Sequence, residues 1–157
     1  MTRYSSLAIL FVSIGLVACG GDDDSSSAPT KAEYAKQASK ICSDTEKELE
    51  NIGEDSQDPQ EVADAIDKVI TEAKQAANDL VALERPEGDA GQTAEEFSEG
   101  FKSELNEQII PAMEELRDAL KKKDVAGVQA AAKKLQELET SKSDNAAREL
   151  GATDCVG

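Results

Sequence analysis

Apolar residues recur at every third or fourth position in four segments of the sequence, with polar stretches between them. This spacing places the apolar side chains of each segment on one face of an α-helix. We therefore predict four amphipathic helices, at about residues 30–52, 59–84, 93–123 and 125–150. The stripe of the first helix comprises Tyr34, Ala38, Ile41, Thr45, Leu49 and Ile52.

The residues at the ends of these segments are typical of helix termini. Asp58 is followed by Pro59, a pair that caps and starts a helix, and Thr93-Ala94-Glu95-Glu96 matches a capping box. Asp124 is suited to cap the fourth helix, and Gly151 is suited to end it.

Two places interrupt the helical pattern. Pro111 lies inside the third helix and removes one backbone hydrogen bond, so we expect a bend near residues 107–111; a ligand cleft at the bend is the alternative. Residues 139–145 contain no apolar side chain. We expect the fourth helix to continue through them, and a break with a new cap at Ser143 or Asp144 is the alternative.

Four amphipathic helices joined by short connectors predict an all-α fold, an up-down-up-down four-helix bundle formed by residues 30–157. This length suits one domain of ordinary size. The chain has no Trp, and aromatic residues make up 3% of it, so the core must come from Leu, Ile, Val and Ala.

Residues 1–18 have the three parts of a signal peptide: a basic start at Arg3, an apolar run over residues 7–18, and small residues before a cleavage site. The apolar run is 12 residues long. A membrane-spanning helix needs about 20 apolar residues, so we expect this segment to be removed and not to serve as a permanent anchor.

The end of this run, Leu16-Val17-Ala18-Cys19, resembles the lipobox of bacterial lipoproteins. The resemblance implies that the signal peptidase recognises Leu16, Val17 and Ala18 and cleaves before Cys19, which carries diacylglycerol on its sulfur. Residues 19–29, rich in Gly, Asp and Ser, would then be a disordered acidic tether, and the domain would face the extracytoplasmic side of the cell membrane. An ordinary secretory signal is the alternative.

The chain is strongly acidic, with 33 Asp and Glu against 17 Lys and Arg and a formal net charge of −16. Removal of residues 1–18 takes away one basic residue and no acidic one, which makes the net charge −17. This charge repels nucleic acid, so no nucleic-acid partner is expected, and it repels anionic lipids, so membrane attachment must come from Cys19. We interpret it as a solvated surface; capture of a cationic partner or a metal ion is the alternative.

Three cysteines are present, and lipidation of Cys19 would leave Cys42 and Cys155 as a pair. Outside the cytoplasm a disulfide is the expected state of such a pair. It would tie the end of the chain to the first helix across 113 positions. Two reduced buried thiols or a redox-active pair are the alternatives, although the sequence has no C-x-x-C motif.

The sequence contains no histidine, which excludes histidine-dependent catalytic triads, the zinc metalloprotease motif and the Glu-x-x-His ligands of di-iron bundles. It also has no phosphate-binding glycine loop and no EF-hand. We therefore predict a protein that is not an enzyme and that has no metal site and no cofactor. Adjacent carboxylates and Ser-Lys pairs are interpreted as solvated surface groups: Glu95-Glu96, Glu114-Glu115, Ser39-Lys40 and Ser141-Lys142.

The lipobox and the acidic spacer are followed in order by Tyr34-x3-Ala38-x2-Ile41-Cys42, Leu80-x2-Leu83-x2-Pro86 and Gly151-x3-Cys155. Together these motifs resemble a group of small lipoproteins common in actinobacteria. The resemblance covers most of the chain and implies a helical domain held by a bond between Cys42 and Cys155, but it supplies no activity.

The leading functional hypothesis is a non-enzymatic, lipid-anchored module that binds an extracytoplasmic protein partner or a small ligand. One alternative is a carrier of a small molecule or lipid, with a cavity at the Pro111 bend and an alanine-lined core. The other is a cation-binding or structural protein of the cell envelope.

Overall fold

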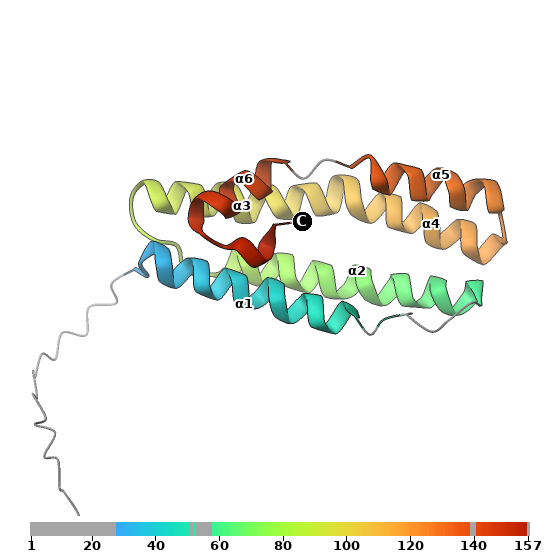
Figure 1. Ribbon diagram of the computed structural model, residues 1–157, viewed down its shortest axis with the longest axis horizontal. Helices are drawn as coiled ribbons and strands as arrows, with labels where there is room; N and C mark the ends of the chain where they lie inside the picture. The colour runs from blue at the N-terminus through green and yellow to red at the C-terminus, as the bar shows by residue number, and fades with distance from the viewer. Residues whose placement is uncertain (1–27, 51, 53–57, 139–140, 157) are drawn as a thin grey trace, which may run out of the picture.

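The computed structural model of the protein describes residues 28–50, 52, 58–138 and 141–156. Within these residues the fold is all-helical and contains no strand, as predicted. In Figure 1, α3 and α4 follow one another along the molecule, and α5 and α6 lie back along them. The elements are α1 (Lys31–Glu50), α2 (Pro59–Ala82), α3 (Asp89–Glu104), the π-helical turn η1 (Leu105–Ile109), α4 (Ile110–Lys122), α5 (Val125–Gln136), α6 (Ser141–Leu150) and the 3-10 turn η2 (Thr153–Cys155).

Side-chain caps fix the starts of three helices. The Asp58 carboxylate accepts a hydrogen bond from the Gln60 amide at 2.7 Å, and the Asp124 carboxylate accepts one from the Gly127 amide at 3.1 Å, so both predicted caps are confirmed. At α1, the Thr30 amide donates to Glu33 at 2.8 Å and the Glu33 amide donates to the Thr30 hydroxyl at 3.3 Å. This reciprocal capping box holds the pKa of Glu33 below its usual value.

The prediction that the third helix begins at Thr93 is wrong, because α3 begins one turn earlier, at Asp89. Gly88 precedes it with a φ of 67°, and the Thr93 hydroxyl donates to the Asp89 carbonyl inside the helix. Gly91 lies in the first turn of α3 and lets this turn approach the preceding loop, since a Cβ atom there would lie 2.2 Å from the Pro86 carbonyl oxygen.

The prediction of one continuous helix through residues 139–145 is also wrong. α5 ends at Gln136 and α6 begins at Ser141, which is earlier than the alternative caps at Ser143 and Asp144. The two helices have different neighbours: α5 packs on α4, whereas α6 packs on α3 and α1. The break therefore lets each short helix place its own apolar side chains against a different part of the molecule.

Near the position of the bend expected at residues 107–111, the structure has a π-helical turn. The Ile110 amide donates to the Leu105 carbonyl five residues earlier, and the Asn106 side-chain amide donates to the Lys102 carbonyl at 2.8 Å. Pro111 follows directly and has no amide hydrogen to donate, which favours such a local rearrangement of the hydrogen-bond ladder.

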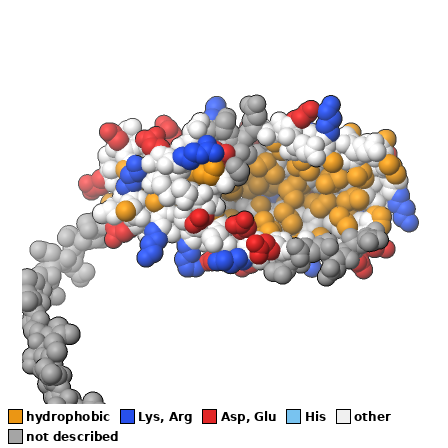
Figure 2. Space-filling view, in the orientation of Figure 1, with side chains coloured by type: hydrophobic (Ala, Val, Ile, Leu, Met, Phe, Trp, Pro, Cys, Tyr) orange, Lys and Arg blue, Asp and Glu red, His pale blue; other side chains and the backbone are white. Residues whose placement is uncertain are grey.

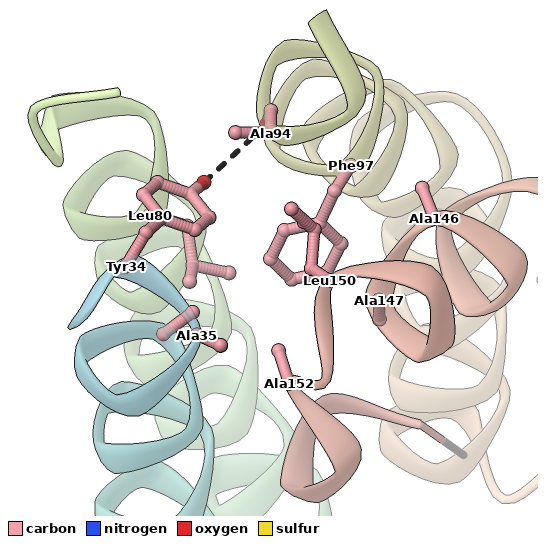
Figure 3. Packing of buried hydrophobic residues seen from close by; sticks show 10 residues of the cluster. Tyr34, Ala35, Leu80, Ala94, Phe97, Ala146, Ala147, Leu150 and Ala152 are labelled. Carbon is pink, nitrogen blue, oxygen red and sulfur yellow. Dashed lines mark hydrogen bonds between the residues drawn. The ribbon is translucent and has the colours of Figure 1, made fainter. Parts of the chain in front are cut away.

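The buried apolar residues form two cores. The first joins α1, the end of α2, α3 and α6, and Figure 3 shows its aromatic members Tyr34 and Phe97 together with Leu80 and Leu150. Alanines fill the spaces between these large side chains. The second core joins α2, η1 and α4 through Ile66, Ile70, Ala77, Leu105 and Ile110.

The two cores differ in how completely the surrounding helices cover their apolar side chains. α1 packs on α2, α3, α6 and η2, whereas α4 packs between α2 and α5 at the other end. At that end Figure 2 shows a broad apolar surface between α5 and α2. We call the half-buried apolar side chains packed there against the second core the open apolar face: Val62, Ala73, Ile109, Met113, Leu116 and Leu120.

Candidate functional site: an apolar cavity beside the disulfide

A cavity of about 560 Å³ lies where α1, α2, the end of α3, η1, α6 and the C-terminal turn meet. Most of its wall is apolar, and it is partly open to solvent. Ala73 and Ile109 belong both to its wall and to the open apolar face, so the cavity is continuous with that face. Its wall comprises Cys42, Thr45, Glu46, Leu49, Ala73, Ala76, Phe101, Glu104, Ile109, Ser143, Asp144, Thr153, Asp154, Cys155 and Val156.

The disulfide between Cys42 and Cys155 forms one side of the cavity. The two sulfur atoms are 2.01 Å apart and the Cα atoms 5.2 Å apart, so the predicted bond is present. Gly151 ends α6 with a φ of 89°, a conformation that glycine adopts without a steric penalty, and the chain turns there toward α1. The Cys155 amide then donates to the Ala152 carbonyl, which closes the turn η2, and η2 packs against α1.

Small residues on α2 leave the space that the cavity occupies. Ala73 and Ala76 line the cavity, and a longer apolar side chain at either position would take up part of its volume. The Thr45 hydroxyl on the opposite wall donates to the Ile41 carbonyl of its own helix at 2.9 Å. Because this polar group has its partner within α1, the wall keeps its apolar character there.

The polar part of the wall is acidic. Glu46, Glu104, Asp144 and Asp154 line the cavity, and none of the described residues that line it is basic. The almost completely buried Ser143 hydroxyl donates to the Glu104 carboxylate, which ties α6 to the end of α3. Asp144 lies 3.8 Å from Arg148 of the same helix, so its charge is partly balanced.

The predicted site residues have different outcomes. Leu16, Val17, Ala18 and Cys19 lie outside the described residues. Pro111 does not line the cavity, although Ile109, two residues earlier in the π-helical turn, does. The π-helical turn before Pro111 thus contributes to the cavity wall through Ile109.

Three members of the pairs interpreted as surface groups take part in ion pairs: Glu95, Glu115 and Lys40. Glu95 binds Arg85 at 3.2 Å, and Glu115 binds Lys134 at 2.7 Å, which joins α4 to α5. Lys40 pairs with Asp44 one turn further along α1. These contacts agree with a structural interpretation of the charged side chains.

The described residues contain no group of three or more His, Cys, Asp or Glu residues placed to hold a metal ion. None of their helices combines the length and the apolar composition needed to cross a bilayer.

Sequence reasoning missed the cavity itself. Ala73 and Ala76 have the spacing of packed apolar positions in an amphipathic helix, and Glu46, Glu104 and Asp154 belong to no motif. The only available signal was the run of small residues in the second helix, which fits a tight helix contact equally well.

No protein-family model matches the chain, and neither a curated protein nor a solved structure with significant similarity to it was found.

Proposed function

We propose that this protein is a non-enzymatic binding protein, anchored by a lipid on Cys19 to the extracytoplasmic side of the cell membrane, that holds an apolar small molecule beside the Cys42–Cys155 bond. The observation that carries the proposal is the cavity of about 560 Å³ with its mainly apolar wall. Ligand sites in proteins are typically apolar concavities of about 300–1,000 Å³ with a few polar groups. We infer that the domain is an up-down-up-down bundle of four helices. The third consists of α3, η1 and α4, and the fourth consists of α5 and α6.

The wall is suited to a bound molecule because a disulfide and a hydrogen bond hold its elements together. The disulfide joins α1 to the end of the chain, and the Ser143–Glu104 hydrogen bond joins α6 to α3. Both links restrain separation of the elements around the cavity. A site held open in this way loses less conformational entropy on binding than one that must first form.

The lipid anchor is supported by the sequence Leu16-Val17-Ala18-Cys19 and by the Gly, Asp and Ser-rich residues 20–28 that follow. Acyl chains contribute about 0.8 kcal/mol per buried methylene, so two or more chains hold a protein on a bilayer. Growth of the native cells with a labelled fatty acid should place label on the wild-type protein and not on a Cys19→Ser variant. Label on the variant would rule out this anchor.

The binding function is tested with a neutral apolar fluorescent probe on residues 20–157, which contain every described element and need no detergent that would compete for the site. Ala73→Phe should fill the cavity and weaken probe binding about tenfold or more. Ala82→Phe, an exposed substitution on the same helix, is the matched control and should bind like the wild type.

Circular dichroism and melting temperature establish that both variants are folded. If the wild type binds no probe, or if Ala73→Phe binds it as tightly as the wild type, the proposed site is wrong.

A further inference from the structure

We propose that the ligand of this cavity is a cationic amphiphile, a single alkyl chain with an amine or quaternary ammonium head group. The inference rests on the proposed function and adds the charge of the ligand. The alkyl chain would lie against the apolar wall formed by Ala73, Ala76 and Ile109, and the head group would lie at the acidic edge.

The charge of the cavity wall has one sign. Glu46 comes from α1, Glu104 from the end of α3, and Asp154 from η2, so three separate elements bring carboxylates to the same cavity. None of the described lining residues is Lys or Arg, although the full chain contains 17 of them. Elsewhere on the surface acidic and basic side chains pair between elements, as in Glu115 with Lys134. The fourth carboxylate of the wall, Asp144, has a basic neighbour in Arg148 at 3.8 Å, so the proposal rests on the other three.

The position of the carboxylates sets where the cation would lie. Glu46 and Asp154 are exposed and Glu104 is half-buried, so the charges lie at the edge of the apolar volume and not inside it. A cation held there keeps part of its hydration, which avoids the large cost of burying a charge. In Figure 2 several acidic side chains lie at the lower left edge of the apolar surface.

The same geometry disfavours the other common amphiphiles. An anionic head group, as in a fatty acid, would meet like charges at the edge and a net charge of −16 over the whole chain. A neutral head group would gain only the apolar contacts. Binding strength should therefore rank cationic, neutral and anionic, and the advantage of the cation should shrink with added salt.

The experiment is calorimetric titration of the oxidised protein, residues 20–157, with dodecyltrimethylammonium, dodecyl maltoside and dodecyl sulfate, each below its critical micelle concentration. The three probes share one alkyl chain and differ in head group and charge. We expect the cation to bind about tenfold tighter than the neutral probe, and the anion to bind most weakly.

Two double variants distinguish the effect of the carboxylates at the cavity edge from the effect of the overall charge. Glu46→Gln with Asp154→Asn should weaken binding of the cation about tenfold and leave the neutral probe unchanged. Glu87→Gln with Glu96→Gln removes the same charge from exposed positions that do not line the cavity, and should change neither probe by more than about twofold.

The outcomes distinguish the two levels of the proposal. Equal binding of all three probes, abolished by Ala73→Phe, would overturn the charge assignment and leave the apolar site in place. Tightest binding of the anion, or equal loss of cation binding in both double variants, would also overturn it. Absence of binding by every probe would overturn the proposed function together with this inference.

Discussion

The phenolic hydroxyl of Tyr34 in α1 donates a hydrogen bond to the Ala94 carbonyl in α3 at 3.3 Å, across 60 positions of sequence. The tyrosine side chain is completely buried in the first core, so this bond is shielded from water. Burial raises the pKa of Tyr34, while a hydrogen bond with Ser98 and the charge of Arg85 partly oppose the increase.

The raised pKa of Tyr34 predicts a loss of stability in alkali. Its contribution is complete below the ordinary tyrosine pKa of about 10 and disappears as the pH rises through the higher value in the folded state. Tyr34 is the only aromatic hydroxyl in residues 20–157, and the chain has no Trp, so tyrosinate absorbance reports this group alone. We expect the tyrosinate absorbance to appear over the same pH range as unfolding, which is monitored by circular dichroism.

Tyr34→Phe is the control for this pH dependence. It should lower the free energy of unfolding by about 0.5–1.5 kcal/mol at neutral pH, because the hydrogen bond from the tyrosine hydroxyl to the Ala94 carbonyl is lost. It should also remove the part of the alkaline destabilisation that Tyr34 causes. Titration of Tyr34 in the folded protein at the ordinary value would contradict the buried environment.

The disulfide is expected to supply a large part of the stability. A closed loop of 113 positions corresponds to about 4–5 kcal/mol in the chain-entropy model. Replacement of both Cys42 and Cys155 by Ala should therefore lower the melting temperature by about 10–20 °C. Reducing agent should bring the wild type close to the double variant and leave that variant unchanged; a reduced wild type with an unaltered melting temperature would contradict this.

Two glycines of α3 should respond oppositely to alanine. Gly91→Ala should destabilise the protein by about 1–3 kcal/mol, because the new Cβ would meet the Pro86 carbonyl oxygen at 2.2 Å. The new Cβ of Gly100→Ala would have no other atom within 4 Å, so this substitution should stabilise the helix by about 0.5–1 kcal/mol. Denaturant unfolding of the two variants measures both signs, and a neutral Gly91→Ala would show that the first turn of α3 can shift at little cost.

Features governed by neighbouring residues were predictable. The caps at Asp58 and Asp124 follow from side chains two or three positions from their amide partners. The irregularity before Pro111 follows from a missing amide hydrogen. The pairing of Cys42 with Cys155 followed from counting cysteines under the assumption that Cys19 is lipidated.

Features governed by distant residues were not predictable. Gly91 resembles a helix breaker until the position of the Pro86 carbonyl is known. The break between α5 and α6 reflects the different helices on which the two pack, and periodicity within residues 125–150 does not contain that information. Ala73 and Ala76 give the same pattern whether the opposite helix fills their space or leaves a cavity.

An ion-pair cluster between α2 and α4 gives a prediction for acid. The Asp67 carboxylate accepts hydrogen bonds from Arg117 at 2.8 Å and from Lys121 at 3.1 Å. These two bonds hold the pKa of Asp67 below its ordinary value, and the bond from Arg117 has the larger effect. A carboxylate of this kind contributes stability at pH values above its unfolded pKa, about 4, and loses it as the pH falls through the lower folded value.

Asp67→Asn should therefore lower the melting temperature at pH 7, and its difference from the wild type should shrink steadily below about pH 4, where the wild-type carboxylate also becomes neutral. Asp79→Asn is the matched control, because it removes one charge from the same helix at a side chain whose hydrogen-bond partner is the neutral Gln75. Thermal unfolding of the three proteins from pH 2 to pH 7 measures the effect. Added salt should weaken the Asp67 difference at pH 7, since these side chains are partly exposed and their attraction is screened. A deficit in Asp67→Asn that is the same at both ends of the pH range would mean that packing at this position, and not its charge, joins α2 to α4.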